Sequence, residues 1–363
     1  MKIAFYGSSL VSSYWNGAAT YYRGLLRALH ARGYDITFYE PDVYDRQKHR
    51  DIEPPDWCKV VVYDGTVEAL KAVTRHAAEA DIVVKASGVG FEDELLIKEV
   101  LANARPDAIR VFWDVDAPAT LAELRAAPDH PLRRALPSLD FVLTYGGGDP
   151  VVEAYRALGA NRCIPIYNAL DPDTHHPVAP QPRFEADLGF LGNRLPDREA
   201  RVEQFFLEPA ARLPQRRFLL GGAGWHDKPM SGNVNYIGHV GTADHNAFNC
   251  TPRAVLNISR SSMAENGYSP ATRVFEAAGA GACLITDAWV GIELFLKPDE
   301  EVLVARDGND IADIVGGLSA ERARAIGERA LARVLAEHTY AHRAAQADRI
   351  FREFPRSRAE AAE

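Results

Sequence analysis

Three polar residues in the stretch Tyr268 to Asp287, YSPATRVFEAAGAGACLITD, have the chemistry to bind an anion and a sugar. Glu276 follows Arg273 by three residues and Thr272 by four, so a helix would place all three on one face. The free N–H groups at a helix start attract anions, and a carboxylate accepts hydrogen bonds from neighbouring ribose hydroxyls. The stretch therefore predicts a site for a diphosphate joined to a ribose. An ordinary amphipathic helix with a solvated Arg273–Glu276 ion pair fits the same spacing.

Local signals predict a loop, a helix, a glycine turn and a buried strand in this stretch. Ser269 is the predicted N-cap and Pro270 the predicted first helical residue, since proline lacks only an N–H that would have no partner there. Gly279 and Gly281 are predicted to end the helix, because glycine tolerates the left-handed turn. The apolar run from 282 to 286 predicts the strand that follows.

The composition predicts a globular protein of two domains. The chain has 363 residues, 47% of them hydrophobic, and a net charge of −9. The charge and the absence of a basic stripe argue against a nucleic-acid partner. Four dispersed cysteines predict reduced thiols in the cytoplasm. No apolar run reaches the roughly 18 residues of a membrane span, and the start MKIAFYGSS resembles a strand rather than a signal peptide. Any membrane contact is therefore expected to be peripheral.

Alternating apolar runs and helical patterns predict an α/β fold with two Rossmann-like parallel-sheet domains facing across a cleft. The opening comprises a strand at 2–6, a helix at 18–32 and a strand at 35–39, without the GxGxxG of dinucleotide-binding proteins. The predicted parts are a first domain at 1–168, a proline-rich linker at 169–182, a second domain at 183–340, a helix at about 341–355 that returns to the first domain, and a disordered tail at 356–363.

Several stretches resemble glycosyltransferases of GT-B architecture, and most closely the CgeB-like group associated with spore maturation. In the second half these are ADLGFLGNRLPDREARVE, YIGHV, NISRSSMAENGYSPATRVFEAAGAGACLITD and ELFLKPDEEVLVARD. FWDVDAPATL and DFVLTYGGGDPVVEAYRALGA are similar to that group's N-terminal region. The resemblance implies transfer of a sugar from a nucleotide-sugar donor held mainly by the second domain.

The resemblance also implies roles for individual residues. Glu276 would bind the ribose, and Arg198 and Arg273 would bind the diphosphate, with Arg273 also stabilising the leaving group. The other implied donor-binding residues are Gly192 and Asn193 at a glycine turn and His239 and Val240 at the nucleobase. The helix-start argument adds Ser269 and Thr272, and Tyr268 lies in the loop before the helix, where it would contact the donor sugar. The paired glutamates of the retaining enzymes are not intact, because the nearest upstream acid, Glu265, lies eleven residues before Glu276. Retention or inversion of the anomeric configuration therefore stays open.

The first domain offers candidates for the acceptor side. Asn16 and Gly17 lie at the start of the first predicted helix, and Asp114 and Asp116 end a strand and are expected to point the same way. Asp116 is the candidate catalytic base, with a helix cap as the alternative. These residues spell DVD, which binds Mn²⁺ in another glycosyltransferase architecture, but GT-B enzymes hold the donor without a metal.

Two further features have ordinary interpretations. His175 and His176 lie in the proline-rich segment and are predicted to be exposed rather than to bind a metal. Trp225 follows a glycine-rich turn, where it would either stack on a base or pack in the core.

These observations predict a metal-independent glycosyltransferase with no cofactor. Its expected partners are a nucleotide-sugar donor and a glycan, protein or small-molecule acceptor. Two alternatives stay open: a nucleotide-sugar epimerase or hydrolase on the same fold, and a non-catalytic sugar-nucleotide-binding protein.

Overall fold

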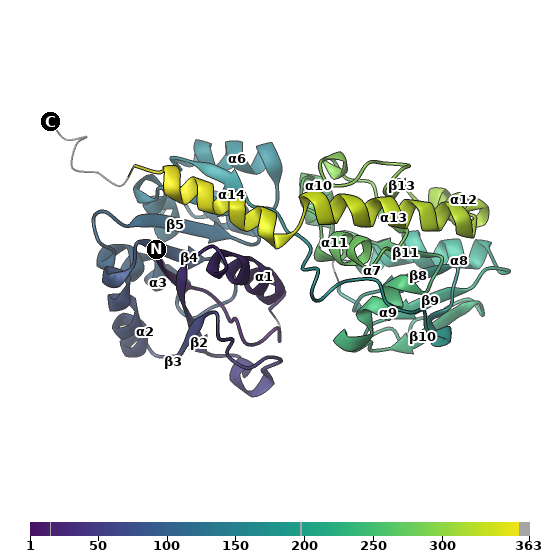
Figure 1. The fold of residues 1–363 in the computed structure, drawn as a ribbon, viewed down its shortest axis with the longest axis horizontal. Coiled ribbons are helices and arrows are strands. Elements are labelled where there is room, and N and C mark those ends of the chain that lie inside the picture. Colours follow the sequence, from purple (N-terminus) through teal and green to yellow (C-terminus); the bar gives the residue numbers. More distant parts are fainter. Residues whose placement is uncertain (15, 197, 356–363) are drawn as a thin grey trace. The chain divides into compact units, whose positions relative to one another are not determined.

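The chain forms two compact units, each built on its own sheet (Figure 1). The structure is a computed structural model that describes residues 1–14, 16–196 and 198–355. The first unit comprises residues 1–167 and the last helix, and the second comprises residues 168–339. The tail from Arg356, predicted to be disordered, lies outside the described residues.

The first unit is built on a parallel sheet of seven strands in the order β3-β2-β1-β4-β5-β6-β7. Its strands are β1 (Lys2–Tyr6), β2 (Asp35–Asp42), β3 (Lys59–Asp64), β4 (Ile82–Ala86), β5 (Ile109–Asp114), β6 (Phe141–Thr144) and β7 (Cys163–Pro165). The strands are largely apolar because helices cover both faces of such a sheet. The predicted Rossmann-like sheet of the first domain is confirmed.

Helices connect these strands. The described α-helices of this unit are α1 (Ala19–His30), α2 (Val67–Thr74), α3 (Asp93–Asn103), α4 (Ala117–Ala126), α5 (Pro131–Ala135), α6 (Gly148–Ala157) and α14 (Tyr340–Glu353), and its short 3₁₀ turns are η1 (Arg46–His49), η2 (Arg75–Glu79) and η3 (Leu136–Ser138).

The last helix, α14, packs against α1 and so belongs to the first unit (Figure 1). The ring of Tyr340 approaches Gly24 so closely that a Cβ there would lie 2.2 Å from it. The Asp348 carboxylate accepts a hydrogen bond of 2.8 Å from the Tyr34 hydroxyl and pairs with Arg32 at 3.0 Å. The final helical stretch is interrupted at His338 and Thr339, and the boundary between the two units falls between Thr339 and Tyr340.

The second unit has a parallel sheet of six strands in the order β10-β9-β8-β11-β12-β13. Its strands are β8 (Leu188–Leu191), β9 (Phe218–Gly221), β10 (Val234–Gly238), β11 (Ala254–Asn257), β12 (Leu284–Asp287) and β13 (Leu303–Ala305). The second predicted Rossmann-like sheet is therefore confirmed as well.

The described helical elements of the second unit are η4 (Pro182–Phe184), α7 (Glu199–Val202), the π-helical turn η5 (Glu203–Leu207), α8 (Glu208–Arg212), η6 (Thr242–Asp244), α9 (His245–Cys250), α10 (Ser261–Asn266), α11 (Thr272–Gly279), η7 (Ile292–Leu294), α12 (Gly308–Gly317) and α13 (Ala320–Glu337). Among the described helices, none combines the length and apolar character needed to cross a bilayer.

The proline-rich segment before β8 packs along the second unit. The backbone N–H of Leu170 donates to the His338 carbonyl at 2.8 Å. Farther along, the N–H of Gln181 donates to the Thr251 hydroxyl at 3.0 Å. The segment is thus fixed at both ends, and its side chains have defined neighbours in this unit.

In both sheets the chain order reverses at one point, between β1 and β4 and between β8 and β11. In open parallel sheets, ligands bind outside the carboxyl ends of the strands at such a reversal. Residues that follow β8 and β11, among them Gly192 and the chain leading to α11, therefore lie where a ligand is expected.

Candidate functional site

Helix α11 begins later than the sequence predicts. Its first residue is Thr272, and its N-cap is Ala271, which has an extended backbone and makes no side-chain cap. The predictions of Ser269 as N-cap and Pro270 as first helical residue are wrong, because tertiary contacts hold the preceding residues. The Tyr268 N–H donates to Val290 at 2.6 Å, and the Asn168 side chain donates to the Pro270 carbonyl at 3.4 Å.

The end of α11 follows the prediction. The helix ends at Gly279, and Gly281 has a φ of +75°, in the left-handed region that glycine tolerates. At the other end, the first helical hydrogen bond runs from the Val274 N–H to the Ala271 carbonyl. The N–H groups of Thr272 and Arg273 precede this bond, so the positive end of the helix dipole lies beside them.

Arg273 and Glu276 lie together on one side of α11. Nε of Arg273 is 4.0 Å from Oε2 of Glu276, and each side chain is only 18% exposed. Burial lowers the pKa of Arg273, and the Glu276 carboxylate opposes this effect. The solvated ion pair of the alternative interpretation does not describe this geometry, because both groups are mostly withdrawn from water.

His175 also belongs to this site, which the sequence did not predict. Its side chain is buried, with Nε2 4.0 Å from Oε1 of Glu276 and Nδ1 3.0 Å from the Thr174 hydroxyl. The prediction that His175 is exposed is wrong, because the proline-rich segment packs on the second unit. His176, the next residue, is exposed as predicted.

His245, the first residue of α9, is the fourth charged or titratable member of this group. Burial lowers its pKa, the positive charge of Arg273 lowers it further, and Glu276 acts in the opposite direction. Its Nε2 lies 3.3 Å from the Val240 carbonyl oxygen. We call Arg273, Glu276, His175 and His245 the α11 cluster.

Glycine contacts shape the turns after β8 and β9. Gly222 has a φ of +124°, and a Cβ there would lie 2.2 Å from the Gly192 carbonyl oxygen. The same oxygen accepts a hydrogen bond of 2.8 Å from the indole N–H of Trp225. Trp225 is fully buried, so it packs in the core and cannot stack on a ligand base.

Asn193 and Arg198 are joined in the turn that follows β8. The Arg198 guanidinium donates to the Asn193 backbone carbonyl at 2.7 Å, and the Asn193 side-chain oxygen accepts from the Ala223 N–H at 2.9 Å. A Cβ at Gly192 would lie 2.9 Å from Nη2 of Arg198. The predicted diphosphate-binding residues of this turn therefore form one locally ordered group.

The other predicted donor-binding residues have different environments. His239 is exposed immediately after β10, whereas the Val240 side chain is buried and offers only its backbone to a ligand. Tyr268 is half-buried and has a φ of +48°, and its ring lies against Gly291. Ser269 is buried in the loop before α11.

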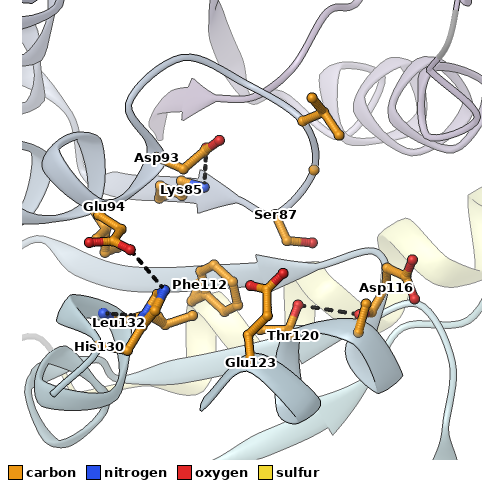
Figure 2. A pocket seen from close by; sticks show the side chains of 14 residues that line it. Lys85, Ser87, Asp93, Glu94, Phe112, Asp116, Thr120, Glu123, His130 and Leu132 are labelled. Carbon is orange, nitrogen blue, oxygen red and sulfur yellow. Dashed lines mark hydrogen bonds and ion pairs between the residues drawn. The ribbon is translucent and has the colours of Figure 1, made fainter. Parts of the chain in front are cut away.

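The first unit brings Asp116 to a cavity but withdraws Asp114 from solvent. Asp114 is fully buried and accepts hydrogen bonds from the Tyr155 and Thr120 hydroxyls at 2.5 and 3.0 Å. Burial raises the pKa of Asp114, and these hydrogen bonds oppose the shift. Asp114 thus holds the end of β5 together, and its place on the acceptor side stays a prediction. Asp116 is half-buried and lines the cavity of Figure 2.

Asn16 is also directed into the protein. It is buried, and its side-chain amide donates to the carbonyls of Ser9 and Ser12 at 2.8 and 3.1 Å. The side chain thus stabilises its own loop, and the place of Asn16 on the acceptor side stays a prediction. Gly17, the next residue, is exposed. Within the described ranges, no three or more His, Cys, Asp and Glu side chains are grouped so that they could hold a metal ion.

Solved structures similar to this chain share both units. Sucrose-phosphate synthase (tll1590) from Thermosynechococcus elongatus has a TM-score of 0.71 and 16% identity over 97% of this chain and 98% of that chain. Alr3699/HepE from Anabaena, in complex with UDP and glucose, has a TM-score of 0.68 and 14% identity over 98% of this chain and all of that chain. The chain has the GT-B fold.

A third similar structure, described as trehalose-6-phosphate from E. coli bound with UDP-2-fluoro glucose, has a TM-score of 0.68 and 10% identity over 98% of this chain and all of that chain. No curated protein matches the sequence. Residues 198–349 match a family model described as glycosyl transferase-like. The matched segment contains Arg273, Glu276 and His245, but not His175 or the turn at Gly192.

Proposed function

We propose that this protein is a glycosyltransferase that transfers a sugar from a nucleotide diphosphate sugar to an acceptor, without a metal ion. The observation that carries the proposal is the largely buried Arg273–Glu276 pair at the start of α11. It lies in the segment that matches the glycosyl transferase-like family. UDP is the first nucleotide to test, because similar structures hold UDP with glucose and UDP-2-fluoro glucose.

In the proposed donor complex, α11 binds the diphosphate and the ribose. The Arg273 guanidinium and the N–H groups at the helix start supply positive charge to the diphosphate. Glu276 accepts hydrogen bonds from the ribose hydroxyls. These contacts are stronger than on an open surface, because both side chains are 18% exposed and little water competes with a ligand. Arg198 adds a second guanidinium from the turn after β8.

Sugar transfer breaks the bond between the anomeric carbon and the diphosphate oxygen and forms a bond from an acceptor oxygen to that carbon. The departing diphosphate gains negative charge, which Arg273 and the α11 dipole stabilise. The acceptor hydroxyl loses a proton, and Asp116 is the proposed base. It is half-buried after the last residue of β5, at the edge of a cavity in the first unit. Asp114 is excluded from this role by its burial and its hydrogen bonds.

The first test is thermal unfolding of the full chain with UDP-, GDP-, dTDP- and ADP-sugars, with and without EDTA. A ligand at a hundredfold excess over its Kd stabilises the native state by about 2.7 kcal/mol. We expect UDP-sugars to raise the Tm most, equally with EDTA. Stabilisation by none of the four would contradict the proposal.

Product analysis then separates the three functions that share a sugar-nucleotide site. Release of UDP that depends on an added acceptor supports transfer. A changed sugar that is still attached to its nucleotide indicates epimerisation, and UDP release without an acceptor indicates hydrolysis. Saturable binding with no product indicates a non-catalytic binding protein.

A further inference from the structure

A cavity of about 500 Å³ lies in the second unit, at the amino ends of its strands. Ala186 precedes β8, Arg217 precedes β9, Arg253 precedes β11 and Cys283 precedes β12. These strands run parallel, so all four residues lie at one edge of the sheet. The predicted donor site lies at the other edge, where the strands have their carboxyl ends.

Two helices that carry the α11 cluster reach this cavity with their opposite ends. Helix α11 has Arg273 in its first turn, and Gly281, two residues after its end, lines the cavity. Helix α9 begins at His245 and ends at Cys250, which also lines the cavity. Because a helix rises 1.5 Å per residue, the eight residues of α11 span about 12 Å. The cavity is therefore separate from the α11 cluster.

The lining of this cavity is basic in a chain that is acidic. Among the residues that line it, Arg217, Arg253 and Arg324 carry positive charge and Glu185 carries negative charge. The lining thus has two net positive charges, whereas the whole chain has a net charge of −9.

The carboxylates near the cavity leave part of this charge uncompensated. Nη1 of Arg253 lies 2.9 Å from Oδ1 of Asp187, and Nη1 of Arg216 lies 3.3 Å from the same oxygen. One carboxylate therefore serves two guanidinium groups. Nη1 of Arg217 lies 3.5 Å from Oε2 of Glu185 in an exposed pair, and such pairs are weak enough for a ligand anion to replace the carboxylate.

Arg324 is the arginine of this lining that is best placed to receive a ligand. It lies on α13 and is exposed, and it makes no hydrogen bond or ion pair with the part of the chain that the structure describes. Its neighbours Glu321 and Arg322 are exposed and add one charge of each sign. The Arg324 guanidinium can therefore bind an anion without giving up a contact within the protein.

Helix ends change this balance only slightly. Ala320, the first residue of the 18-residue helix α13, lines the cavity, so the positive end of that helix lies beside it. The negative ends of α9 and α11 lie there as well. Each helix end is equivalent to about half an elementary charge, so the three ends together add only about half a negative charge. The two positive charges of the lining outweigh it.

We propose that this cavity is a second binding site, for a small phosphorylated organic molecule. Guanidinium groups bind phosphate oxygens through paired hydrogen bonds. The volume exceeds that of a phosphate group, and Pro180 and Pro252 add apolar wall for an organic body. Glu185 accepts hydrogen bonds from hydroxyl groups on that body. This proposal goes beyond the proposed sugar transfer and does not depend on it.

The test is calorimetric titration of the full chain with glucose 6-phosphate, glucose and inorganic phosphate. We expect glucose 6-phosphate to bind at least about tenfold more tightly than glucose and more tightly than inorganic phosphate. Raising the ionic strength from about 0.05 to about 0.5 M should weaken its binding, because salt screens the arginines. No saturable binding of glucose 6-phosphate, or equally tight binding of glucose or of inorganic phosphate, would overturn the proposal.

Variants of Arg324 locate the binding to this cavity. Arg324→Gln should weaken glucose 6-phosphate about three- to tenfold, and Arg324→Glu should weaken it further. Both variants should fold, since Arg324 has no partner among the described residues, and their Tm without ligand checks this. The matched control is Arg329→Gln on the same helix, an exposed arginine outside the cavity that donates to the Glu300 carbonyl. Equal effects of Arg324→Gln and Arg329→Gln would overturn the assignment.

This experiment can fail independently of the proposed function. Binding of glucose 6-phosphate that depends on Arg324, without stabilisation by any nucleotide sugar, would support the cavity assignment and remove the transferase. Stabilisation by UDP-sugars without binding of glucose 6-phosphate would support the donor site and overturn the second site.

Discussion

Nε2 of His175 lies 4.0 Å from Oε1 of Glu276, and both side chains are largely buried in the second unit. This contact joins the proline-rich segment before β8 to the face of α11. Thr174 approaches Nδ1 of His175 at 3.0 Å, so both ring nitrogens have a polar neighbour. We therefore expect His175 to position Glu276.

His175→Gln should weaken UDP binding because Glu276 loses the group that orients its carboxylate. We expect a loss of about three- to tenfold, measured by calorimetry. The effect should be smaller for 2′-deoxy-UDP, which offers Glu276 one hydroxyl fewer. The adjacent and exposed His176 provides the control, and His176→Gln should bind UDP as the wild type does. If the variant loses affinity for UDP and for 2′-deoxy-UDP by the same factor, His175 acts on the overall fold and not through Glu276.

Glu276→Gln should lower UDP affinity by about 10- to 100-fold, because a charge-assisted hydrogen bond contributes about 1.5–3 kcal/mol. The ratio of the affinities for UDP and 2′-deoxy-UDP should fall towards one. Glu328→Gln, an exposed glutamate on α13, is the control and should change neither affinity. An unchanged ratio in Glu276→Gln would remove Glu276 as the ribose-binding residue.

The sequence predicts the sheets well and the α11 cluster only in part. Strands such as Ile109–Asp114 are found where predicted, since strands buried on both faces of a parallel sheet form continuous apolar runs. The start of α11 was mispredicted because contacts from Asn168 and Val290 act across the fold. His175 and His245 reach Glu276 only through tertiary packing, and no local spacing signals that proximity.

Acid should destabilise the second unit through His245. Burial and then Arg273 lower its folded-state pKa, while Glu276 opposes them and nearby His175 adds a small lowering effect. The unfolded chain, with an ordinary pKa of about 6.5, therefore binds a proton more readily. Neutral His245 therefore makes its full contribution to the free energy of unfolding above about pH 6.5. This contribution is lost as the pH falls through the lower pKa that His245 has in the folded state.

The measurement for His245 is the free energy of unfolding in urea at several pH values between about 5 and 8. His245→Asn should reduce the dependence on pH relative to the wild type. The exposed His226 lies in the same unit, and His226→Asn should keep the wild-type slope. A steeper slope in His245→Asn would contradict the lowered pKa.

Variants of the two aspartates at the end of β5 should differ in whether they affect stability or turnover. Asp114→Ala should cost about 3 kcal/mol or more in unfolding free energy, because it leaves buried partners such as the Tyr155 hydroxyl unsatisfied. Asp116→Asn should cost less stability than Asp114→Ala, because the hydrogen bonds that join Asp116 to Asp114 and Thr120 use its backbone and persist in the variant. The rate of sugar transfer by Asp116→Asn should fall by about 10²- to 10⁴-fold, while the variant still binds UDP. Unchanged transfer would remove Asp116 as the base.

Gly222→Ala should disturb the turn that carries Gly192. The new Cβ would lie 2.2 Å from the Gly192 carbonyl oxygen, at a φ of +124° that other residues rarely adopt. We expect a loss of about 1–3 kcal/mol in unfolding free energy from this strain, together with weaker UDP binding. The control is Gly241→Ala, where φ is −67° and a Cβ meets no atom within 4 Å, so stability should change by less than about 0.5 kcal/mol. If Gly222→Ala loses stability but binds UDP normally, the turn at Gly192 is structural and the diphosphate depends on α11 alone.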